Sequence, residues 1–380
     1  MDLYNIPRSI LSHMVEELEE NRKVIILYGP RQVGKTTLAK KVLIQLPYKM
    51  LEINADFDPI KDLIGSKDLQ KIEGLISGIE LLFIDEAQRI PDIGLTLKIL
   101  HDQFPSLRIL VTGSSSFELA NLTQEALTGR SLTFNLFPIA LKELSHLYSP
   151  FELIQRLDSF LIYGMYPEIL SIANTQRKIL YLRELVSSYL YKDLFELSNI
   201  KHPEKIVDLL RLLAFQLGSQ VSQNELGKQL GMARETVESY LDLLEKSFVI
   251  FKLRGYSRNP RKEISKMNKY FFFDLGVRNS LIENFNPMNL RADKGQLWEN
   301  FLLVERMKTQ AYSYTFANRY FWRTYSQQEI DYVEESGGEL RGYEFKYTSR
   351  KEKIPPAWKK DYPEASFQTI HSDNFLSFLL

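Results

Sequence analysis

Gly29-Pro30-Arg31-Gln32-Val33-Gly34-Lys35-Thr36 has the spacing Gly-x-x-x-x-Gly-Lys-Thr. An apolar run, 23–28, precedes these residues and a helix-forming segment, 37–43, follows them, so we expect a loop between a strand and a helix. Such a loop binds phosphate, because its backbone N–H groups and the helix N-terminus face the anion. We predict an ATP site in which Lys35 reaches the terminal phosphates and the Thr36 hydroxyl binds Mg²⁺. The expected nucleotide-binding residues are Gly29, Pro30, Arg31, Gln32, Val33, Gly34, Lys35, Thr36 and Thr37.

A second motif is an apolar run, 79–84, that ends in the carboxylates of Asp85 and Glu86. At the end of a strand, Asp85 can complete the magnesium shell, and Glu86 is placed to polarise the attacking water. A strand-like segment, 48–54, lies between the two motifs. This order, together with a glutamate directly after the aspartate, favours ATPases that use that glutamate as the catalytic base.

Further polar residues are candidates for contacts with the nucleotide. Ser114 or Thr112, at the end of the next apolar run, could sense the terminal phosphate; capping of the following helix explains them equally well. Arg130 follows Leu-Thr-Gly and could stabilise charge on the transferred phosphoryl group, although a neighbouring subunit could supply that arginine instead. Arg8 precedes an amphipathic segment, 10–20, and we interpret it as a surface cation rather than a nucleotide contact.

The motifs together resemble those of a known group. Gly-Pro-Arg-Gln-Val-Gly-Lys-Thr-Thr, Phe-Ile-Asp-Glu-Ala-Gln, Val-Thr-Gly-Ser-Ser-Ser and Leu-Thr-Gly-Arg are similar to motifs of prokaryotic AAA-type ATPases of the extended, STAND-like branch. The resemblance implies ATP binding with slow, switch-like hydrolysis. It also implies a C-terminal region of unknown function that contains a winged helix and a nuclease-like fold.

Composition limits the remaining possibilities. A chain of 380 residues suggests two to three domains, and Lys plus Arg (48) equals Asp plus Glu (48), so a nucleic-acid site must be a local patch. The chain has no cysteine, which excludes disulfides and thiolate chemistry. Without a leader pattern or a bilayer-length apolar run we expect a cytoplasmic protein with no membrane partner. We place the domain boundaries at 1–149, 150–290 and 291–380.

The middle of the chain has the pattern of a winged helix. Three amphipathic segments, 206–213, 222–230 and 234–244, precede two strand-like runs, 249–253 and 269–273. The intervening wing is basic and could contact DNA or another nucleic acid through phosphates, or its fold could instead mediate packing between domains or subunits. Its cations are Lys252, Arg254, Arg258, Arg261, Lys262, Lys266 and Lys269, against Glu263 alone.

The C-terminal segment predicts a helix, 293–307, and strands at 312–316, 320–325, 329–333 and 340–347. Asp331, followed by Glu344-x-Lys346, resembles the PD-(D/E)XK nuclease core, and Glu299 on the helix adds a carboxylate. Asp331, Glu344 and Glu299 are therefore candidate magnesium ligands, and Lys346 a candidate to position or deprotonate the attacking water. A dormant site, or a fold that serves only assembly, is the alternative.

We thus expect an α/β protein: a parallel-sheet P-loop ATPase, a helical and winged-helix middle, and a restriction-endonuclease-like C-terminal domain. The leading hypothesis is an ATPase whose nucleotide state controls a nuclease-like domain acting on or near nucleic acid. The alternative is a nucleotide-operated switch that binds DNA or a protein partner without cleavage, and the chain could also form oligomers.

Overall fold

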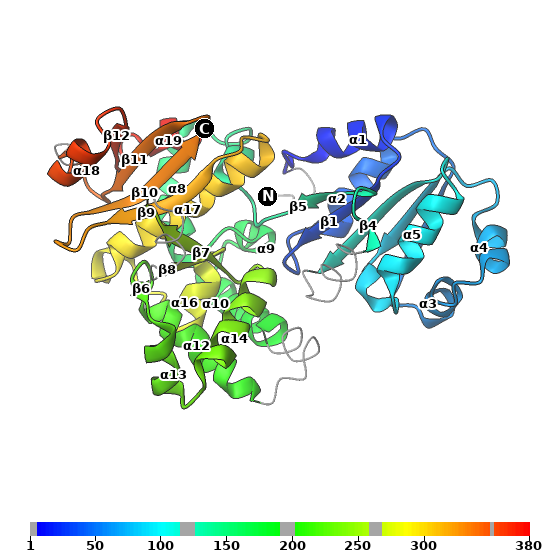
Figure 1. Cartoon of the computed structure of the whole chain (residues 1–380), viewed down its shortest axis with the longest axis horizontal. Coiled ribbons are helices and arrows are strands. Elements are labelled where there is room, and N and C mark those ends of the chain that lie inside the picture. Colours follow the sequence, from blue (N-terminus) through cyan, green and yellow to red (C-terminus); the bar gives the residue numbers. More distant parts are fainter. Residues whose placement is uncertain (1–5, 115–125, 191–201, 258–267, 350–352) are drawn as a thin grey trace.

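The N-terminal part of the chain is a five-stranded parallel sheet covered by helices on both faces (Figure 1). The computed structural model describes residues 6–114, 126–190, 202–257, 268–349 and 353–380. The sheet order is β2-β3-β4-β1-β5, and all its strand pairs are parallel. Its strands are β1 (Val24–Gly29), β2 (Met50–Asn54), β3 (Leu81–Asp85), β4 (Arg108–Ser114) and β5 (Ser131–Asn135).

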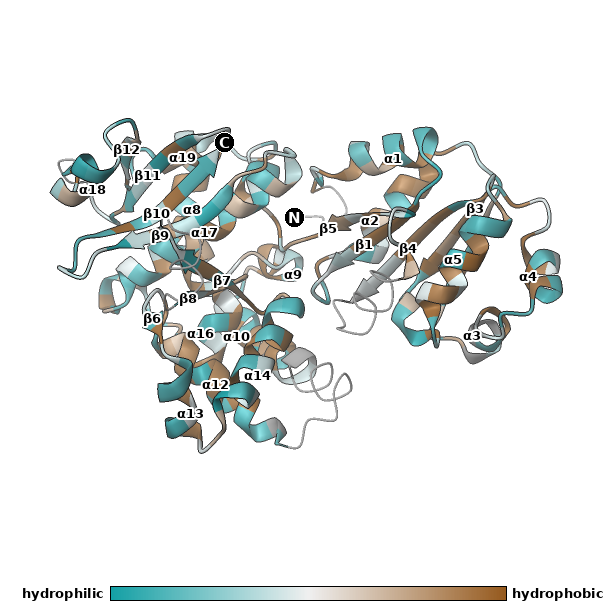
Figure 2. Ribbon diagram, viewed as in Figure 1, coloured by the Kyte–Doolittle hydropathy of each residue, from teal (hydrophilic) through white to brown (hydrophobic). Residues whose placement is uncertain are grey.

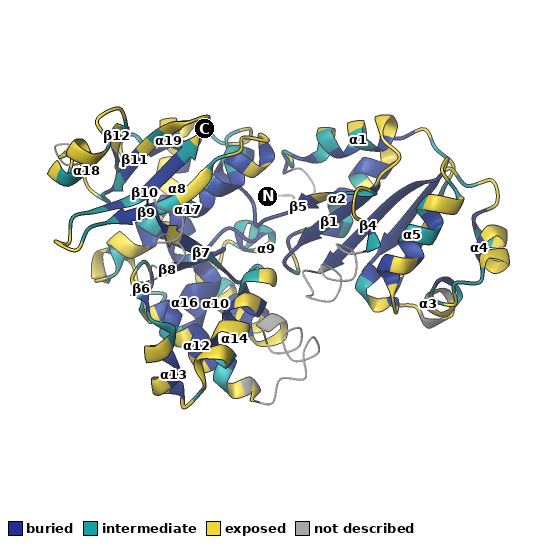
Figure 3. Ribbon diagram, viewed as in Figure 1, coloured by how far each residue is buried: buried dark blue, intermediate teal, exposed yellow. Residues whose placement is uncertain are grey.

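Alternate residues of the central strands enter two different cores, as the period of a strand requires. Ile25 and Leu27 of β1 pack with helices α1 (Leu11–Glu20) and α2 (Lys35–Ile44). Val24 and Ile26 pack instead with α4 (Leu69–Ile76) and α5 (Ile93–Gln103), next to α3 (Asp58–Gly65). Because both of their faces are covered, the central strands β1 and β3 are apolar in Figure 2 and buried in Figure 3.

Helices of the middle region connect the two halves of the molecule. The segment begins with α7 (Leu141–Leu144) and α8 (Pro150–Tyr163), and the Ser149 side chain caps α8 as part of a capping box. It continues with α9 (Pro167–Ser171), α10 (Thr175–Leu185) and the π-helical turn Val186–Leu190. Three further helices then precede the second sheet: α12 (Pro203–Phe215), α13 (Gln223–Leu230) and α14 (Arg234–Lys246).

The second sheet has seven strands in the order β12-β11-β10-β9-β7-β8-β6. The strands β6 (Gln220–Val221), β7 (Ile250–Gly255) and β8 (Asn268–Phe272) form the predicted hairpin with its extra strand. The others are β9 (Asn318–Arg323), β10 (Glu329–Ser336), β11 (Glu339–Phe345) and β12 (Ser366–Ile370). Parallel pairing of β7 with β9 joins the hairpin to the C-terminal strands, so one sheet continues across the expected domain boundary near residue 290.

The long helix α17 (Lys294–Tyr312) runs along this sheet, and the shorter α16 (Leu275–Leu281), α18 (Pro356–Asp361) and α19 (Phe375–Leu379) complete the covering (Figure 1). The predicted strand at 312–316 is wrong. Helix α17 continues through Tyr312, because that side chain is buried against Phe137 of the ATPase part. Among the described residues, no helix is long and apolar enough to cross a membrane.

Candidate functional site

The phosphate-binding loop lies between β1 and α2, as its flanks predicted. Gly34 precedes α2 with φ 93°, a conformation that glycine adopts without steric cost. A Cβ atom on Gly29 would lie 2.1 Å from the carbonyl oxygen of Leu136, so this position admits no larger residue without a main-chain shift. The two glycines thus meet different demands: one turns the chain into the helix and the other lets the loop pass close to neighbouring backbone.

Side chains of the two ATPase motifs meet at the carboxyl end of the sheet. Lys35 is buried, and its Nζ donates to the carbonyl oxygens of Gly29 and Pro30, each at 3.0 Å. The Thr36 hydroxyl donates to Oδ2 of Asp85 at 2.9 Å. A hydroxyl and a carboxylate in contact beside a phosphate loop are hard oxygen donors of the kind that Mg²⁺ prefers, so the residues present fit that ion.

Glu86 is held in a constrained backbone position next to Asp85. Its φ is 53°, in the left-handed region, and its N–H donates to the Thr112 hydroxyl at 3.3 Å. That hydroxyl in turn donates to Oδ1 of Asp85, and Gln88 donates to the Glu86 carboxylate at 2.5 Å. Thr112 therefore ties the two acidic residues together from within the sheet. The side chain of Ser114, the other predicted sensor, lies outside what the structure describes.

Arg130 lies at the wrong edge of the sheet for the role predicted within its own subunit. Its carbonyl accepts from the N–H of Val24 at 2.9 Å, at the start of β1, whereas the phosphate loop follows the end of that strand. Its guanidinium pairs with Asp102 at 2.8 Å. Because parallel strands present their two ends to opposite edges, Arg130 cannot reach a phosphate held by the loop of the same chain.

Two cavities flank the loop and share Gln32, Gly34 and Thr37 among their lining residues. One, of about 390 Å³, is polar and charged, and includes Lys35 and Glu86. The other, of about 470 Å³, lies against the middle region; its apolar walls are Ile6, Val33, Leu38, Ile139 and Pro167. The first suits phosphates with a metal ion, and the second suits a flat apolar group such as a nucleoside base.

The interpretation of Arg8 as a surface cation is wrong. Its side chain is 7% exposed and pairs with Oε1 of Glu143 at 3.1 Å. It also donates to the carbonyl of Val33 in the phosphate loop at 2.9 Å and to that of Phe137 at 2.7 Å. Arg8 thus fastens the loop to the segment that leaves the ATPase sheet. Its partners lie 25 to 135 residues away, so no local pattern could have shown the contact.

A second polar cluster lies where α17 passes the seven-stranded sheet. Asp331 on β10 accepts from the N–H of Phe345 at 2.7 Å, and Lys346 pairs with Glu344 at 2.5 Å. The sequence-predicted set is therefore brought to one region of the fold. Burial is the main cause that raises the pKa of Asp331 and of Glu344, and the mutual repulsion of the two carboxylates raises the pKa of Glu344 further.

Lys269 is a central member of this cluster that sequence reasoning placed on the wing surface. Its side chain is 3% exposed, and its Nζ lies 3.0 Å from Glu299 and 2.6 Å from Glu329. Burial acts to lower the pKa of Lys269, but the two glutamates outweigh it, so the net shift is upward. One feature of the sequence does indicate this burial. Lys269 begins the otherwise apolar run Lys-Tyr-Phe-Phe-Phe, and a lysine in such a strand is more often buried and paired than solvated.

The described residues contain no group of three or more His, Cys, Asp or Glu side chains arranged to hold a metal ion. Glu299 in particular is occupied by the Lys269 ammonium. Its use as a third magnesium ligand beside Asp331 and Glu344 stays a prediction, and it requires that Lys269 move away.

The wing itself, 258–267, lies outside the described residues, and with it Arg258, Arg261, Lys262 and Lys266. At the described ends of the hairpin, Lys252 pairs with Glu245 and Lys269 is buried, while Arg254 is exposed. The basic surface predicted for the wing therefore loses Lys269.

The phosphate loop between β1 and α2, with the Asp85-Glu86 pair beside it at the carboxyl edge of a five-stranded parallel sheet, is the arrangement of a P-loop nucleotide-binding domain. Residues 21–145 match the family model described as an AAA domain. Residues 154–288 and 294–368 match two domains of unknown function, DUF8612 and DUF4143. The chain thus contains an AAA-type P-loop ATPase domain followed by two domains of unknown function, and the AAA domain implies the use of ATP with Mg²⁺.

Similar proteins align with most of this chain. An uncharacterized protein of Mycobacterium tuberculosis is 29% identical over 86% of this chain and 70% of its own length. One from Methanocaldococcus jannaschii is 26% identical over 74% of this chain and 66% of its own length. Among solved structures, a Walker-type ATPase of Pyrococcus abyssi has a TM-score of 0.51 at 17% identity, covering 73% of this chain and 96% of that one. This last similarity concerns the fold alone.

Proposed function

We propose that the protein hydrolyses ATP at the loop after β1, and that its nucleotide state controls a nuclease-like C-terminal site that acts on nucleic acid. The loop and the Asp85-Glu86 pair support the first half. Lys35 would release its own loop carbonyls to bind the terminal phosphates, and Glu86 would orient the attacking water. Thr36 and Asp85 would hold Mg²⁺, which supplies positive charge to the phosphate oxygens.

The single observation that carries the second half is the seating of helix α17 on the segment next to the phosphate loop. Tyr312 accepts from the N–H of Phe137 at 3.1 Å, and Glu305 accepts from the N–H of Leu141 at 2.6 Å. Lys308 donates to the carbonyl of Ile139 at 3.1 Å and pairs with Glu305. All these groups are buried, so the contact is specific and costly to break.

The same helix carries Glu299, which belongs to the C-terminal cluster. Six residues of α-helix separate Glu299 from Glu305, a rise of about 9 Å. At the other end of the path, Arg8 binds both Val33 in the phosphate loop and Phe137 beneath Tyr312. A shift of the loop on nucleotide binding would therefore reach the carboxylates through rigid, buried contacts rather than through an exposed linker.

The C-terminal residues support hydrolysis of a phosphodiester. Asp331 and Glu344 are the oxygen donors that a divalent ion requires, and Lys346 lies beside Glu344, where it can orient a water molecule. Desolvation acts to lower the pKa of Lys346, but Glu344 and Asp331 outweigh it and raise that pKa, so Lys346 acts as a charged, orienting group.

A second function, a switch that binds without cutting, is favoured by one observation. The Lys269 ammonium contacts both Glu299 and Glu329, so a cation of the protein itself already offsets part of the negative charge of the cluster. In that case nucleotide binding would alter a docking surface for DNA or a protein partner. The acidic cluster around Lys269 would then only stabilise the fold.

Two assays test the proposal. ATP turnover should fall at least tenfold in Lys35→Ala and in Glu86→Gln; unchanged turnover in both contradicts the ATPase assignment. Cleavage of a mixed DNA and RNA pool, run with ATP, ADP and no nucleotide, should depend on Mg²⁺ and on nucleotide. It should vanish in Asp331→Ala and Lys346→Ala. Absence of cleavage under all conditions, with ATP turnover intact, would select the switch.

A further inference from the structure

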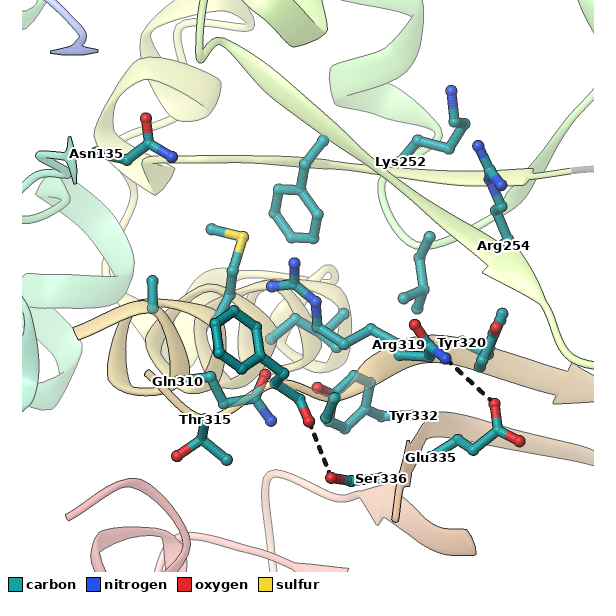
Figure 4. Close-up of a pocket in the computed structure, with 18 of the residues that line it drawn as sticks. Asn135, Lys252, Arg254, Gln310, Thr315, Arg319, Tyr320, Tyr332, Glu335 and Ser336 are labelled. Atoms are coloured by element: carbon teal, nitrogen blue, oxygen red, sulfur yellow. Dashed lines mark hydrogen bonds between the residues drawn. The ribbon is translucent and has the colours of Figure 1, made fainter. Parts of the chain in front are cut away.

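A groove of about 1000 Å³ opens where strands β7 and β9 separate (Figure 4). The two strands pair through Arg254–Tyr320 and Gly255–Phe321. However, the pairing of β7 with β8 reaches back to Ile250, and that of β9 with β10 reaches back to Asn318. The beginnings of β7 and β9 therefore diverge. The space between them is lined by the hairpin of β7 and β8, the end of α17, the strands β9 and β10, and Asn135 and Phe137 of the ATPase part.

Aromatic side chains form the floor and the rim of this groove. In the floor, Phe137 stacks on Phe273 with ring centroids 5.7 Å apart, and Phe248 and Phe251 pack edge-on against Phe273. On the rim, Phe316 is 84% exposed and Tyr314 is 44% exposed. Covering the exposed Phe316 ring with a flat group is favourable, because apolar surface is removed from water. The floor rings already pack against one another and need no such partner.

The charged residues that line the groove are three cations, Lys252, Arg254 and Arg319, and two carboxylates, Glu245 and Glu335. Arg254 on β7 and Arg319 on β9 are both exposed, and within the described part of the chain neither has an ion-pair partner. Lys252 pairs with Glu245 at 3.0 Å, and Glu335 accepts a hydrogen bond from Asn318. Figure 4 shows Lys252 and Arg254 on one strand and Arg319 on the strand across the groove. Two guanidinium groups without an ion-pair partner among the described residues thus line the same groove as the exposed aromatic rings.

We propose that this groove binds single-stranded nucleic acid. Unpaired bases would stack on Phe316 and on neighbouring rim tyrosines, and Arg254 and Arg319 would contact the phosphates on either side. Every base can stack on an aromatic ring, but only when it is not paired with a second strand. A groove with aromatic rings at its rim therefore suits single-stranded nucleic acid, whereas a recognition helix would suit a duplex. An acidic peptide would satisfy the arginines but would leave Phe316 uncovered. The inference takes only its substrate class, nucleic acid, from the proposed function. The binding assay needs neither ATP hydrolysis nor cleavage of the nucleic acid.

The test is fluorescence anisotropy with fluorescein-labelled oligo-dT and oligo-rU, on the full chain, in EDTA so that no cleavage can occur. Phe316→Ala should weaken binding about tenfold, the usual effect of losing one stacking partner, and Phe316→Trp should restore it. Arg254→Ala with Arg319→Ala should weaken binding at least tenfold and lower the salt dependence by about 0.7 per lost phosphate contact. The matched controls are Phe215→Ala and Arg211→Ala, both on exposed positions of α12 outside the groove, and they should bind like wild type.

Three results would overturn the proposal: no binding by the wild-type protein, equal binding by the groove variants and the controls, or displacement of the oligonucleotide by poly-glutamate at equal affinity. The last would assign the groove to an acidic peptide. Because the assay omits Mg²⁺, its outcome is independent of ATP turnover and of cleavage. Failure of the ATPase or nuclease tests therefore leaves this inference standing, and its own failure leaves them unaffected.

Discussion

Replacing Lys269 by Met removes the only charge that neutralises a buried Glu299 by direct contact among the described residues, while the aliphatic part of the side chain is kept. The Glu299 side chain is 13% exposed, and breaking such a pair from one side costs about 3–5 kcal/mol. We expect a loss near 3 kcal/mol in the free energy of unfolding, because Glu329 is more exposed and also lies 3.6 Å from Arg323.

The loss should depend on pH in a defined direction. Burial raises the pKa of Glu299 in the folded protein, to about 8 even with Lys269 beside it, whereas the unfolded chain has the ordinary value of about 4.3. A group whose folded pKa is raised binds its proton more tightly in the folded state, so stability falls as pH rises from the unfolded to the folded value. Without the lysine the pKa of Glu299 in the folded protein rises further, so the fall continues to higher pH and the gap between Lys269→Met and wild type should widen above about pH 8.

Tryptophan fluorescence during urea unfolding is a selective assay for this prediction. The chain has 3 tryptophans, and all are buried: Trp298 on α17, Trp322 on β9 and Trp358 on α18, with Trp298 next to Glu299 in the sequence. Adding Glu299→Gln to Lys269→Met should recover about 2 kcal/mol at pH 9. Lys252→Met, which breaks a partly exposed pair between β7 and Glu245 on α14, should cost less than about 1 kcal/mol. Equal stability of Lys269→Met and wild type at pH 9, or no recovery in the double variant, would refute the reasoning.

Three further predictions concern the ATP site. Arg8→Lys keeps a cation near Glu143 but carries its three donors on one nitrogen, so it cannot span the three acceptors that Arg8 reaches through three different nitrogens. ATP binding by calorimetry should therefore weaken about fivefold and stability should fall by about 1–3 kcal/mol; unchanged binding would mean that the loop does not depend on this anchor. Gly29→Ala places its Cβ against the Leu136 carbonyl, so ATP binding should fall more than tenfold while circular dichroism shows a folded protein. Tyr181→Phe removes the hydroxyl that donates to Gln32 at 2.7 Å, and release of a fluorescent ADP analogue, followed by stopped flow, should accelerate about two- to tenfold; equal rates would show that α10 does not restrain the loop.

The sequence predicted those features that depend on neighbours along the chain. The phosphate loop, the strand that ends at Asp85, and the hairpin of β7 and β8 each follow from local pattern, and the structure places them as expected. The burial of Arg8 and Lys269 could not be predicted in this way, because a charged side chain is buried only where distant partners meet it. The same reason applies to Tyr312, where contact with Phe137 extends a helix over residues that have strand propensity. The pairing of β7 with β9 is likewise a long-range event, between residues 254 and 320.

That pairing limits how the chain can be divided or recombined. A fragment beginning near residue 291 would keep β9 but lose β7, and the exposed edge of β9 would then be free to pair with another copy. Removing the C-terminal strands would in turn bare the edge of β7 and the apolar floor of aromatic rings beside it. We therefore expect either half to aggregate when expressed alone, and we expect recombination between homologues to succeed when the exchanged piece contains residues 203–380 as one block. The smallest piece that can be exchanged intact in this region is therefore the whole sheet, even though two separate family models match its sequence.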